Sequence, residues 1–342
     1  MSFTRPARAA NGRPGRRGFL VLAGSATASL ALPARAQALP VIGYLGSESP
    51  AVYATRLEAF REGLADQGFT EGRNVTIQFR WADGQYGRLP ALAKELAKDL
   101  TDLPLAVLVA PGGAEVALAA KAATTTIPIV FEMGGDPVAL GIVQSLSRPG
   151  GNLTGVSSLS VEVSRKRLEF LREVRPSAKR FAVALNPKSP TAETQLKNLQ
   201  AAAASLGVEL VVLKASTEAD FEGLFTGARD ADAGGLVFSS DPYFAYRSQP
   251  LAALAVRHKV AAMTQSRDFP LAGGLMSYGG DFSQSHRQTG RQAGRILKGE
   301  KPADLPVQRV TKVELFINLK AATALGIAFP TSLLTSADRI IE

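Results

Sequence analysis

The chain has 342 residues, of which 46% are hydrophobic and 20% are charged, and its formal net charge is +9. This length and composition exclude an intrinsically disordered protein and allow two domains with full cores. Six of the nine net positive charges come from arginines in residues 1–38, which contain no acidic residue, so the remaining +3 gives no support for a nucleic-acid-binding surface.

Residues 1–36 have the pattern of an export signal. Two adjacent arginines (16–17) precede an apolar run (19–32), and an Ala-Arg-Ala triplet (34–36) then supplies an A-x-A cleavage site. The run is shorter than the roughly 20 residues of a membrane-spanning helix. Arg-Arg-Gly-Phe-Leu resembles a twin-arginine signal, and a Sec signal with two adjacent arginines is the alternative. We expect cleavage near Ala36 and a periplasmic product, and the lack of cysteine excludes disulfides and a lipid-modified cysteine.

Short apolar runs alternate with amphipathic helical patterns through the rest of the chain. Most runs are continuously apolar, which is typical of parallel strands covered on both faces. The expected strands are 41–46, 75–82, 105–110, 127–132, 153–157, 181–185, 208–214, 235–239, 260–264 and 275–278. The expected helices lie near 52–67, 87–100, 113–123, 138–147, 160–174, 191–205, 217–228, 243–258 and 284–298. This alternation predicts an α/β fold with two doubly wound parallel sheets.

One α/β unit is present twice in the sequence. The segments 41–50 and 181–190 share Leu, Ser and Pro at matching positions, and each is followed by a helical pattern and a glycine turn, at Gly68 and Gly207. Duplication of one unit explains the match, and convergent βα architecture is the alternative. Two similar units predict two lobes with a cleft between them.

The lobes are assigned from the glycine-rich segments 149–155 and 277–281, which suit hinges. We assign 39–157 to the first lobe, 158–280 to the second, and about 281–342 to the first again. The tail contains an expected strand around 307–317 and a short helix from Asn318.

No motif for catalysis or phosphate binding is present. The chain lacks a G-x-S-x-G elbow and a phosphate-binding P-loop, and the loop over 43–48 lacks the G-x-G-x-x-G spacing of nicotinamide enzymes. His258 and His286 have no metal ligand at suitable spacing. Glu132 and Asp136 are separated by a Met-Gly-Gly turn. We therefore expect no catalytic residue, no metal and no cofactor.

Small and polar residues gather in the loops after the expected strands, where open parallel sheets bind their ligands. Free N–H groups at the helix starts there could hold a carboxylate. Asp136 or Asp241 could receive an ammonium group, and Tyr243 could cover an aromatic group. At each position, helix capping or turn formation is the alternative. The candidate ligand-binding residues are Ser47, Ser49, Gly112, Gly113, Asp136, Ser157, Asn186, Thr191, Ser240, Asp241, Tyr243 and Tyr278.

Several longer motifs carry a family resemblance. They are Ile127-Pro-Ile-Val-Phe with Asp136-Pro-Val-Ala, Ser147-Arg-Pro-Gly-Gly-Asn-Leu-Thr-Gly155, and the segments 166–171, 273–279, 295–299, 301–306, 314–320 and 337–342. From about residue 40 to its end, the chain resembles ABC-transporter substrate-binding proteins of the type I, TrpX-like class. The resemblance implies a Venus-flytrap fold whose strand-end loops line the ligand cleft. It also implies a permease in the inner membrane as the partner.

We therefore expect a non-enzymatic, exported and monomeric solute-binding protein. Its solute would be a small molecule such as an amino acid or a small carboxylate. The 111–113 turn lacks the hydroxyl expected in an amino-acid carboxylate site, which argues against an amino acid. One alternative is an exported α/β enzyme, for which Glu132, Asp136 and Asp241 are the only candidates. The other is a sensory protein that presents its ligand to a membrane receptor.

Overall fold

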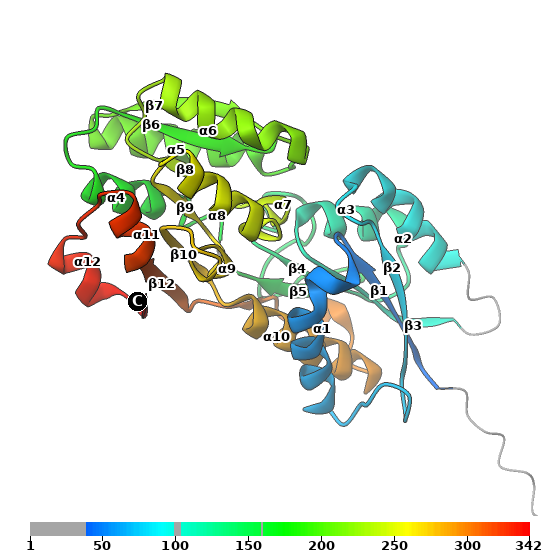
Figure 1. Cartoon of the computed structure of the whole chain (residues 1–342). Helices are drawn as coiled ribbons and strands as arrows, with labels where there is room; N and C mark the ends of the chain where they lie inside the picture. The colour runs from blue at the N-terminus through cyan, green and yellow to red at the C-terminus, as the bar shows by residue number, and fades with distance from the viewer. Residues whose placement is uncertain (1–38, 99–103, 159) are drawn as a thin grey trace, which may run out of the picture. The chain divides into compact units, whose positions relative to one another are not determined.

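The computed structural model describes residues 39–98, 104–158 and 160–342 (Figure 1), so the expected export signal over 1–36 lies outside the described residues. The strands are β1 Val41–Gly46, β2 Thr76–Trp81, β3 Leu105–Pro111, β4 Ile129–Met133, β5 Leu153–Ser157, β6 Arg180–Leu185, β7 Glu209–Lys214, β8 Leu236–Phe238, β9 Ala262–Thr264, β10 Met276–Gly280, β11 Gln308–Arg309, β12 Val313–Asn318 and β13 Arg339–Ile341. The α-helices are α1 Pro50–Ala65, α2 Leu89–Lys98, α3 Ala114–Ala123, α4 Ser164–Val174, α5 Ala192–Leu206, α6 Phe221–Asp230, α7 Pro242–Ala245, α8 Ser248–Arg257, α9 Asp268–Leu271, α10 Phe282–Leu297, α11 Leu319–Ala324 and α12 Thr331–Ser336. Single 3₁₀ turns cover Tyr86–Arg88, Glu218–Asp220 and Pro302–Asp304.

The strands form two sheets that share one internal order. The six-stranded sheet runs β11-β5-β4-β3-β1-β2, and the seven-stranded sheet runs β13-β12-β10-β9-β8-β6-β7. We call each sheet with its helices lobe 1 and lobe 2, respectively. The order β2-β1-β3-β4-β5 recurs as β7-β6-β8-β9-β10, which is the repeat that the sequence shows. Neighbouring strands are parallel, apart from the antiparallel pair β10 and β12. The predicted fold class, two mostly parallel α/β sheets, is confirmed.

Helices cover both faces of each sheet because the strands are apolar on both sides. In lobe 1, Ile42 and Tyr44 of β1 pack with α1 and α10, whereas Leu45 packs with α2 and α3 on the other face. In lobe 2, Val183 of β6 packs with α4 and α5, and Ala184 packs with α6 and α8. In each parallel sheet the carboxyl ends of the strands and the starts of the following helices therefore lie along one edge, where a ligand can bind.

The chain passes between the lobes three times, which corrects two predictions. The first crossing follows β5, next to the glycine-rich segment 149–155 near which we expected it. The second follows β10, and α10 packs against α1 of lobe 1. The third lies between β11, which pairs with β5, and β12, which pairs with β10. The single strand expected over 307–317 is therefore two strands in different sheets, and the assignment of 281–342 to lobe 1 is wrong from β12 onwards.

Two expected helices also differ. Residues 138–147 form turns, because Gly141 adopts a left-handed φ of 65° and ends the first turn after Pro137. The helix expected over 243–258 is divided into α7 and α8 at 246–247. In the described ranges, none of the helices has the length and apolarity that crossing a membrane requires.

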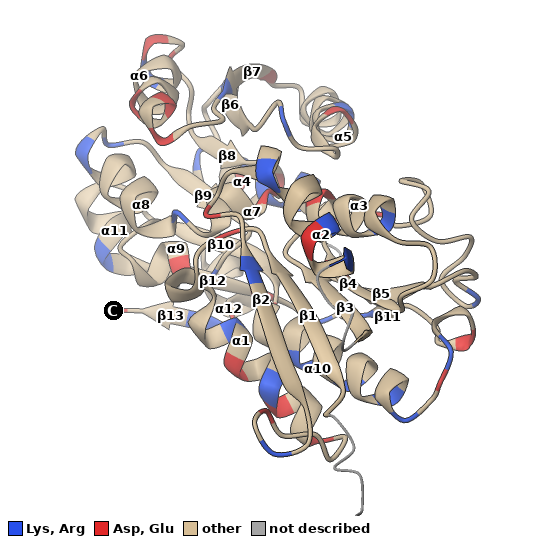
Figure 2. Cartoon of the chain, turned by 90° about the vertical axis from the view of Figure 1, so that its right-hand side faces the viewer, with Lys and Arg blue, Asp and Glu red and all other residues tan. Residues whose placement is uncertain are grey.

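Positions of Lys and Arg and positions of Asp and Glu are both spread over the described chain (Figure 2). Arg287 and Arg291 of α10, for example, both pair with Asp66, which directly follows α1, at 3.0 and 2.7 Å. Because basic side chains are neutralised in this way, lobe 1 presents no continuous basic face along these two helices.

Candidate ligand-binding site

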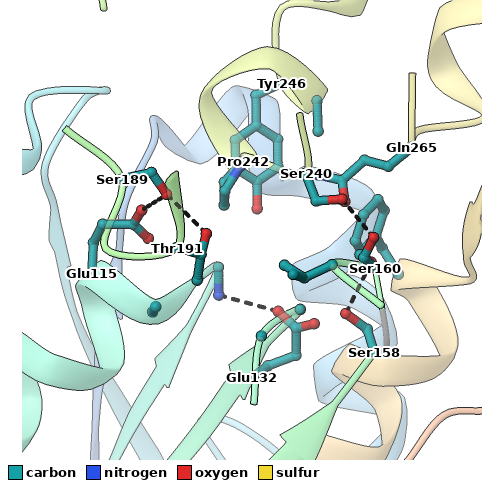
Figure 3. A pocket seen from close by; sticks show the side chains of 18 of the residues that line it. Glu115, Glu132, Ser158, Ser160, Ser189, Thr191, Ser240, Pro242, Tyr246 and Gln265 are labelled. Carbon is teal, nitrogen blue, oxygen red and sulfur yellow. Dashed lines mark hydrogen bonds between the residues drawn. The ribbon is translucent and has the colours of Figure 1, made fainter. Parts of the chain in front are cut away.

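A pocket of about 490 Å³, counting its mouth, lies at the carboxyl ends of strands from both lobes (Figure 3). Lobe 1 contributes Arg56, Gly112, Gly113, Ala114, Glu115, Glu132, Gly134, Gly135, Ser158 and Phe282, together with Ser160 and Val161 from the first crossing. Lobe 2 contributes Ser189, Thr191, Ser240, Pro242, Ala245, Tyr246 and Gln265.

Glu132 forms the floor of the pocket. It lies in β4, one residue before the end of the strand, and its Oε2 accepts a hydrogen bond of 3.2 Å from the Gly112 N–H. Its Oε1 is buried and has no hydrogen-bond partner among the described residues. Burial raises the pKa of Glu132 to about 7, although the Gly112 N–H, the Arg56 charge and the Ser158 hydroxyl act in the opposite direction.

The β3–α3 turn brings its backbone against this floor because it is made of glycines. Gly112 and Gly113 have φ values of 97° and 124°, which disfavour any other residue. A Cβ at Gly112 would also lie 1.8 Å from the Tyr53 hydroxyl oxygen. The turn therefore needs glycine for its conformation and for its close contact with Tyr53.

Glu115 is a second buried carboxylate, in the first turn of α3. Its Oε1 accepts a hydrogen bond of 3.0 Å from the Ser189 hydroxyl of lobe 2, and Ser189 also contacts Thr191 at 3.1 Å. Its Oε2 is buried without a hydrogen-bond partner in the described chain. Burial, followed by the nearby charge of Asp241, raises the pKa of Glu115 to about 8.

Gln265 supplies a third acceptor to the pocket. Its Nε2 donates to the Asp241 carbonyl oxygen at 3.3 Å, which fixes the orientation of the amide, while its Oε1 is buried and has no partner in the described residues. Buried polar atoms are normally hydrogen-bonded. Three unpartnered acceptors on one pocket, from Glu115, Glu132 and Gln265, therefore favour a ligand that carries hydrogen-bond donors.

Aromatic rings and one arginine form another part of the wall. The Arg56 guanidinium lies 4.5 Å from the ring centroid of Tyr246 and 5.2 Å from that of Phe282, both within cation–π range. Arg56 also pairs with Asp268 of lobe 2 at 3.3 Å. In Figure 3 the Tyr246 hydroxyl points into the pocket. Such a surface is suited to covering an apolar or aromatic group.

Several polar contacts join the lobes around the pocket. Arg247 donates to both carboxylate oxygens of Glu48 at 3.1 Å, and the Tyr86 hydroxyl donates to Asp241 at 3.2 Å. Glu48 and Arg247 are 3% and 15% exposed in their side chains, so this ion pair is largely withdrawn from solvent. The two lobes are thus in contact in this structure, with the pocket between them.

Four of the twelve predicted residues line the pocket: Gly112, Gly113, Thr191 and Ser240. The other eight do not line it. Four of these eight lie in lobe 1. Ser47 contacts the Tyr53 hydroxyl at 3.2 Å, and Ser49 lies at the start of α1. Asp136 accepts from the Val138 N–H in a turn, and Ser157 donates to the Gly135 carbonyl oxygen.

The remaining four lie in lobe 2. We expected Asp241 to receive an ammonium group, but it is fully buried. As the N-cap of α7, its carboxylate accepts a hydrogen bond of 2.8 Å from the Tyr243 N–H, and it also accepts one from the Asn186 amide. Tyr243 packs on Phe221, and Tyr278 packs edge-on against Phe170. The capping and packing alternatives apply to these side chains because each finds a partner within its own loop or core.

Sequence reasoning missed most of the remaining lining residues. Glu132 and Ser158 lie at the ends of expected strands, and in the sequence only this position indicates that they could contact a ligand. Arg56, Tyr246 and Phe282 lie in or beside helices, where the sequence gives no indication that they turn towards a cleft. In the described part of the chain, no group of three or more His, Cys, Asp or Glu side chains is arranged to hold a metal ion.

Comparison with known proteins adds a family and a fold. The family model described as "ABC transporter substrate binding protein" matches residues 46–341. A protein of Clostridioides difficile (strain R20291) named "Tyrosine-binding protein" is 28% identical over 275 residues, which are 78% of this chain and 75% of that protein.

Two solved structures match with a TM-score of 0.79. A conserved domain protein from Vibrio cholerae is 29% identical, and the match covers 88% of this chain and 99% of that one. An ABC domain from Streptococcus pneumoniae, solved in complex with L-Trp, is 23% identical over 89% of this chain and 100% of that one. At that identity, the second match shows likeness of fold.

Proposed function

Because the chain belongs to the ABC transporter substrate-binding protein family, we propose that it captures an aromatic amino acid such as tyrosine and delivers it to a membrane permease. Proteins of this family bind solutes and work outside the cytoplasm. We further propose that the signal over residues 1–36 exports the chain to the periplasm and that it works as a monomer. The match to a tyrosine-binding protein supports the ligand class.

The observation that carries this proposal is the unpartnered, buried Oε1 of Glu132. An ammonium group has donors only, so it can satisfy this acceptor and supply a counter-charge. Glu115 Oε2 and Gln265 Oε1 offer acceptors for further donors, such as a phenol hydroxyl. Tyr246 and Phe282 provide the aromatic wall.

The sequence argument against an amino acid, the lack of a hydroxyl at 111–113, loses its force in this pocket. Hydroxyl groups reach it from other loops instead, at Ser158, Ser160, Ser189, Thr191 and Ser240. These groups come from strand ends in both lobes and the first crossing, so a carboxylate does not need the β3–α3 turn. We propose no catalytic role for the carboxylates, since the ammonium group accounts for Glu132 and a second donor of the ligand accounts for Glu115.

Closure is driven by the ligand in this proposal. A solute that touches Glu132 in lobe 1 and Gln265 or Tyr246 in lobe 2 has more contacts in the closed state than in an open one. That difference in affinity shifts the population towards closure. The permease would then recognise the closed arrangement, in which contacts such as Glu48 with Arg247 join the lobes.

A direct ligand test is native mass spectrometry of freshly purified protein, followed by titration calorimetry with tyrosine, tryptophan and phenylalanine. We expect one or more of these to bind in the micromolar range or tighter, because several buried groups are satisfied together. Tyrosine without its amino group, 3-(4-hydroxyphenyl)propionate, should bind at least tenfold more weakly. If this deaminated compound binds as well as tyrosine, the ammonium site at Glu132 is excluded.

The affinity for tyrosine should rise with pH. Burial raises the pKa of Glu132 to about 7 and that of Glu115 to about 8, so both are largely protonated at pH 6 in the unliganded protein. An ammonium ligand binds the ionised carboxylate, so the protein releases a proton when the ligand binds. Below about pH 7, the dissociation constant should therefore fall by up to about tenfold for each increase of one pH unit. Calorimetry in two buffers of different ionisation enthalpy should show proton release near neutral pH. Uptake of protons would contradict the charge assignment.

A further inference from the structure

Lobe 2 contains a buried cation directly behind the pocket wall. Arg167, in the first half of α4, has no solvent exposure. Its Nη1 donates to the Tyr278 carbonyl oxygen at 2.9 Å, and its Nη2 donates to the Ser160 carbonyl oxygen at 3.2 Å and to the Ser240 hydroxyl. Its Nε is buried and has no partner in the described chain.

This guanidinium has no counter-ion in the described residues. Its partners are two carbonyl oxygens and one hydroxyl, and no described carboxylate lies within ion-pair distance of it. Burial lowers the pKa of Arg167 to about 9, so the charge is retained at neutral pH although it is costly. Arg56, the other arginine of the site, differs because Asp268 neutralises it.

Three hydroxyl groups connect the arginine to the pocket. Ser240 accepts from Arg167 and donates to the Ser160 carbonyl at 2.5 Å, and the hydroxyls of Ser160 and Ser158 are 3.2 Å apart. All three serines line the pocket. Figure 3 shows this hydroxyl wall on one side of the central space, across from Thr191 and Ser189.

We propose that the Ser158–Ser160–Ser240 wall is an anion subsite and that Arg167 is the specificity-determining residue behind it. The proposal rests on the proposed function, because the carboxylate of the bound amino acid is the counter-ion that Arg167 lacks. The Ser160 hydroxyl donates to the carboxylate, whereas Ser240, whose proton is given to the Ser160 carbonyl, links Arg167 to the wall. The buried charge stabilises the carboxylate through a medium of low dielectric constant. Glu132 at the floor and Arg167 behind the wall then give the pocket two opposite charges, which a zwitterion matches.

The test compares tyrosine with tyramine, which keeps the ring and the ammonium group but lacks the carboxylate. Calorimetry near pH 8 should give a wild-type preference for tyrosine of at least tenfold. In Arg167→Gln that preference should fall at least tenfold, through weaker binding of tyrosine with little change for tyramine. A merely structural role would weaken both compounds alike and leave their ratio unchanged, which would overturn the proposal.

Two further variants keep the test decisive. Arg165→Gln is the matched control, since Arg165 lies on the same helix with a side chain that is 70% exposed, and its tyrosine-to-tyramine ratio should equal that of the wild type. Ser240→Ala leaves Arg167 in place and removes the hydroxyl that it contacts. It should lower the ratio at least threefold, whether or not Arg167→Gln folds.

The outcomes separate this inference from the proposed function. Equal binding of tyrosine and tyramine by the wild type overturns the anion subsite and leaves the proposed function standing. The proposal is also overturned if Arg56→Gln loses the preference for tyrosine over tyramine while Arg167→Gln keeps it. In that case Arg56 binds the carboxylate. Failure of the wild type to bind any aromatic amino acid overturns both.

Discussion

Replacement of Glu132 by glutamine should strongly weaken ligand binding and at the same time stabilise the unliganded protein. The substitution keeps the shape of the side chain and an oxygen that can accept from the Gly112 N–H. It removes the negative charge that we assign to the ammonium group of the ligand. Loss of one partner of a buried charge pair costs about 2–5 kcal/mol, so affinity for tyrosine should fall by roughly 30-fold or more.

The gain in stability follows from the same burial. The pKa of Glu132 is raised to about 7 from an ordinary value of 4.5, so between these pH values the folded state holds a proton that the unfolded chain has released. The free energy of unfolding of the wild type therefore falls as the pH rises from 4.5 to about 7. Above pH 7 the buried charge costs up to about 3 kcal/mol, because a tenfold change in a proton-binding constant corresponds to about 1.4 kcal/mol.

Urea unfolding at two pH values checks this expectation. Near pH 8, without ligand, Glu132→Gln should be more stable than the wild type by about 1–3 kcal/mol, and near pH 4.5 the two should be nearly equal, because the carboxyl is then neutral. Glu173→Gln, at an exposed position on α4, is the matched control and should change neither stability nor binding. A variant that binds tyrosine normally, or that is less stable at both pH values, would contradict the role given to Glu132.

Replacement of Gly290 by alanine should destabilise lobe 1 severely although alanine is the better helix former. Gly290 of α10 lies against α1, where an added Cβ would be 2.1 Å from the Phe60 carbonyl oxygen and 2.9 Å from the Leu64 nitrogen. At Gly63, on the facing helix, a Cβ would be 1.9 Å from the Arg287 carbonyl oxygen. These neighbours are backbone atoms, so the two helices would have to move apart.

The expected loss in the free energy of unfolding is about 3 kcal/mol or more, at the upper end of what overpacking costs. Gly223→Ala in α6 is the matched control, because it places the same methyl group in a helix with no atom within 4 Å. It should stabilise the protein by about 0.5–1 kcal/mol, the usual advantage of alanine over glycine in a helix. Thermal and urea unfolding of both variants would test the expectation, and equal stability of Gly290→Ala and the wild type would show that the helices are not held at this distance.

The strands were predictable because each is a short, continuously apolar run. β1 and β5 have the boundaries that the sequence indicates, and the repeat of 41–50 at 181–190 corresponds to β1 and β6 at the same place in two sheets of the same order. The sequence could not indicate which sheet a strand joins. Residues 307–317 look like one extended segment, yet β11 pairs with β5 and β12 with β10.

The candidate site was predictable in position and less so in its residues. The loops after the strands were expected to bind the ligand, and the pocket lies there, with Gly112, Gly113, Thr191 and Ser240 in its wall. Asp241 was selected for its charge and its place after β8, but the Tyr243 N–H, Tyr86 and Asn186 occupy its carboxylate. Whether a polar side chain in a loop is free or already bound depends on neighbours that are far away in the sequence.

The sequence by itself determined the α/β class, the two similar lobes and the family, because apolar periodicity and family motifs are local properties of the chain. The tertiary structure alone decided which charges are buried and unpaired. In the sequence, Glu132 is the last residue of an expected strand and Arg167 lies in a helical pattern, and neither position tells what surrounds the side chain. The closure of loops and helices around them removes water and leaves Glu132 Oε1 and Arg167 Nε without a hydrogen-bond partner among the described residues. Since desolvation depends on everything that packs around a group, the chemistry of this pocket follows from the fold as a whole.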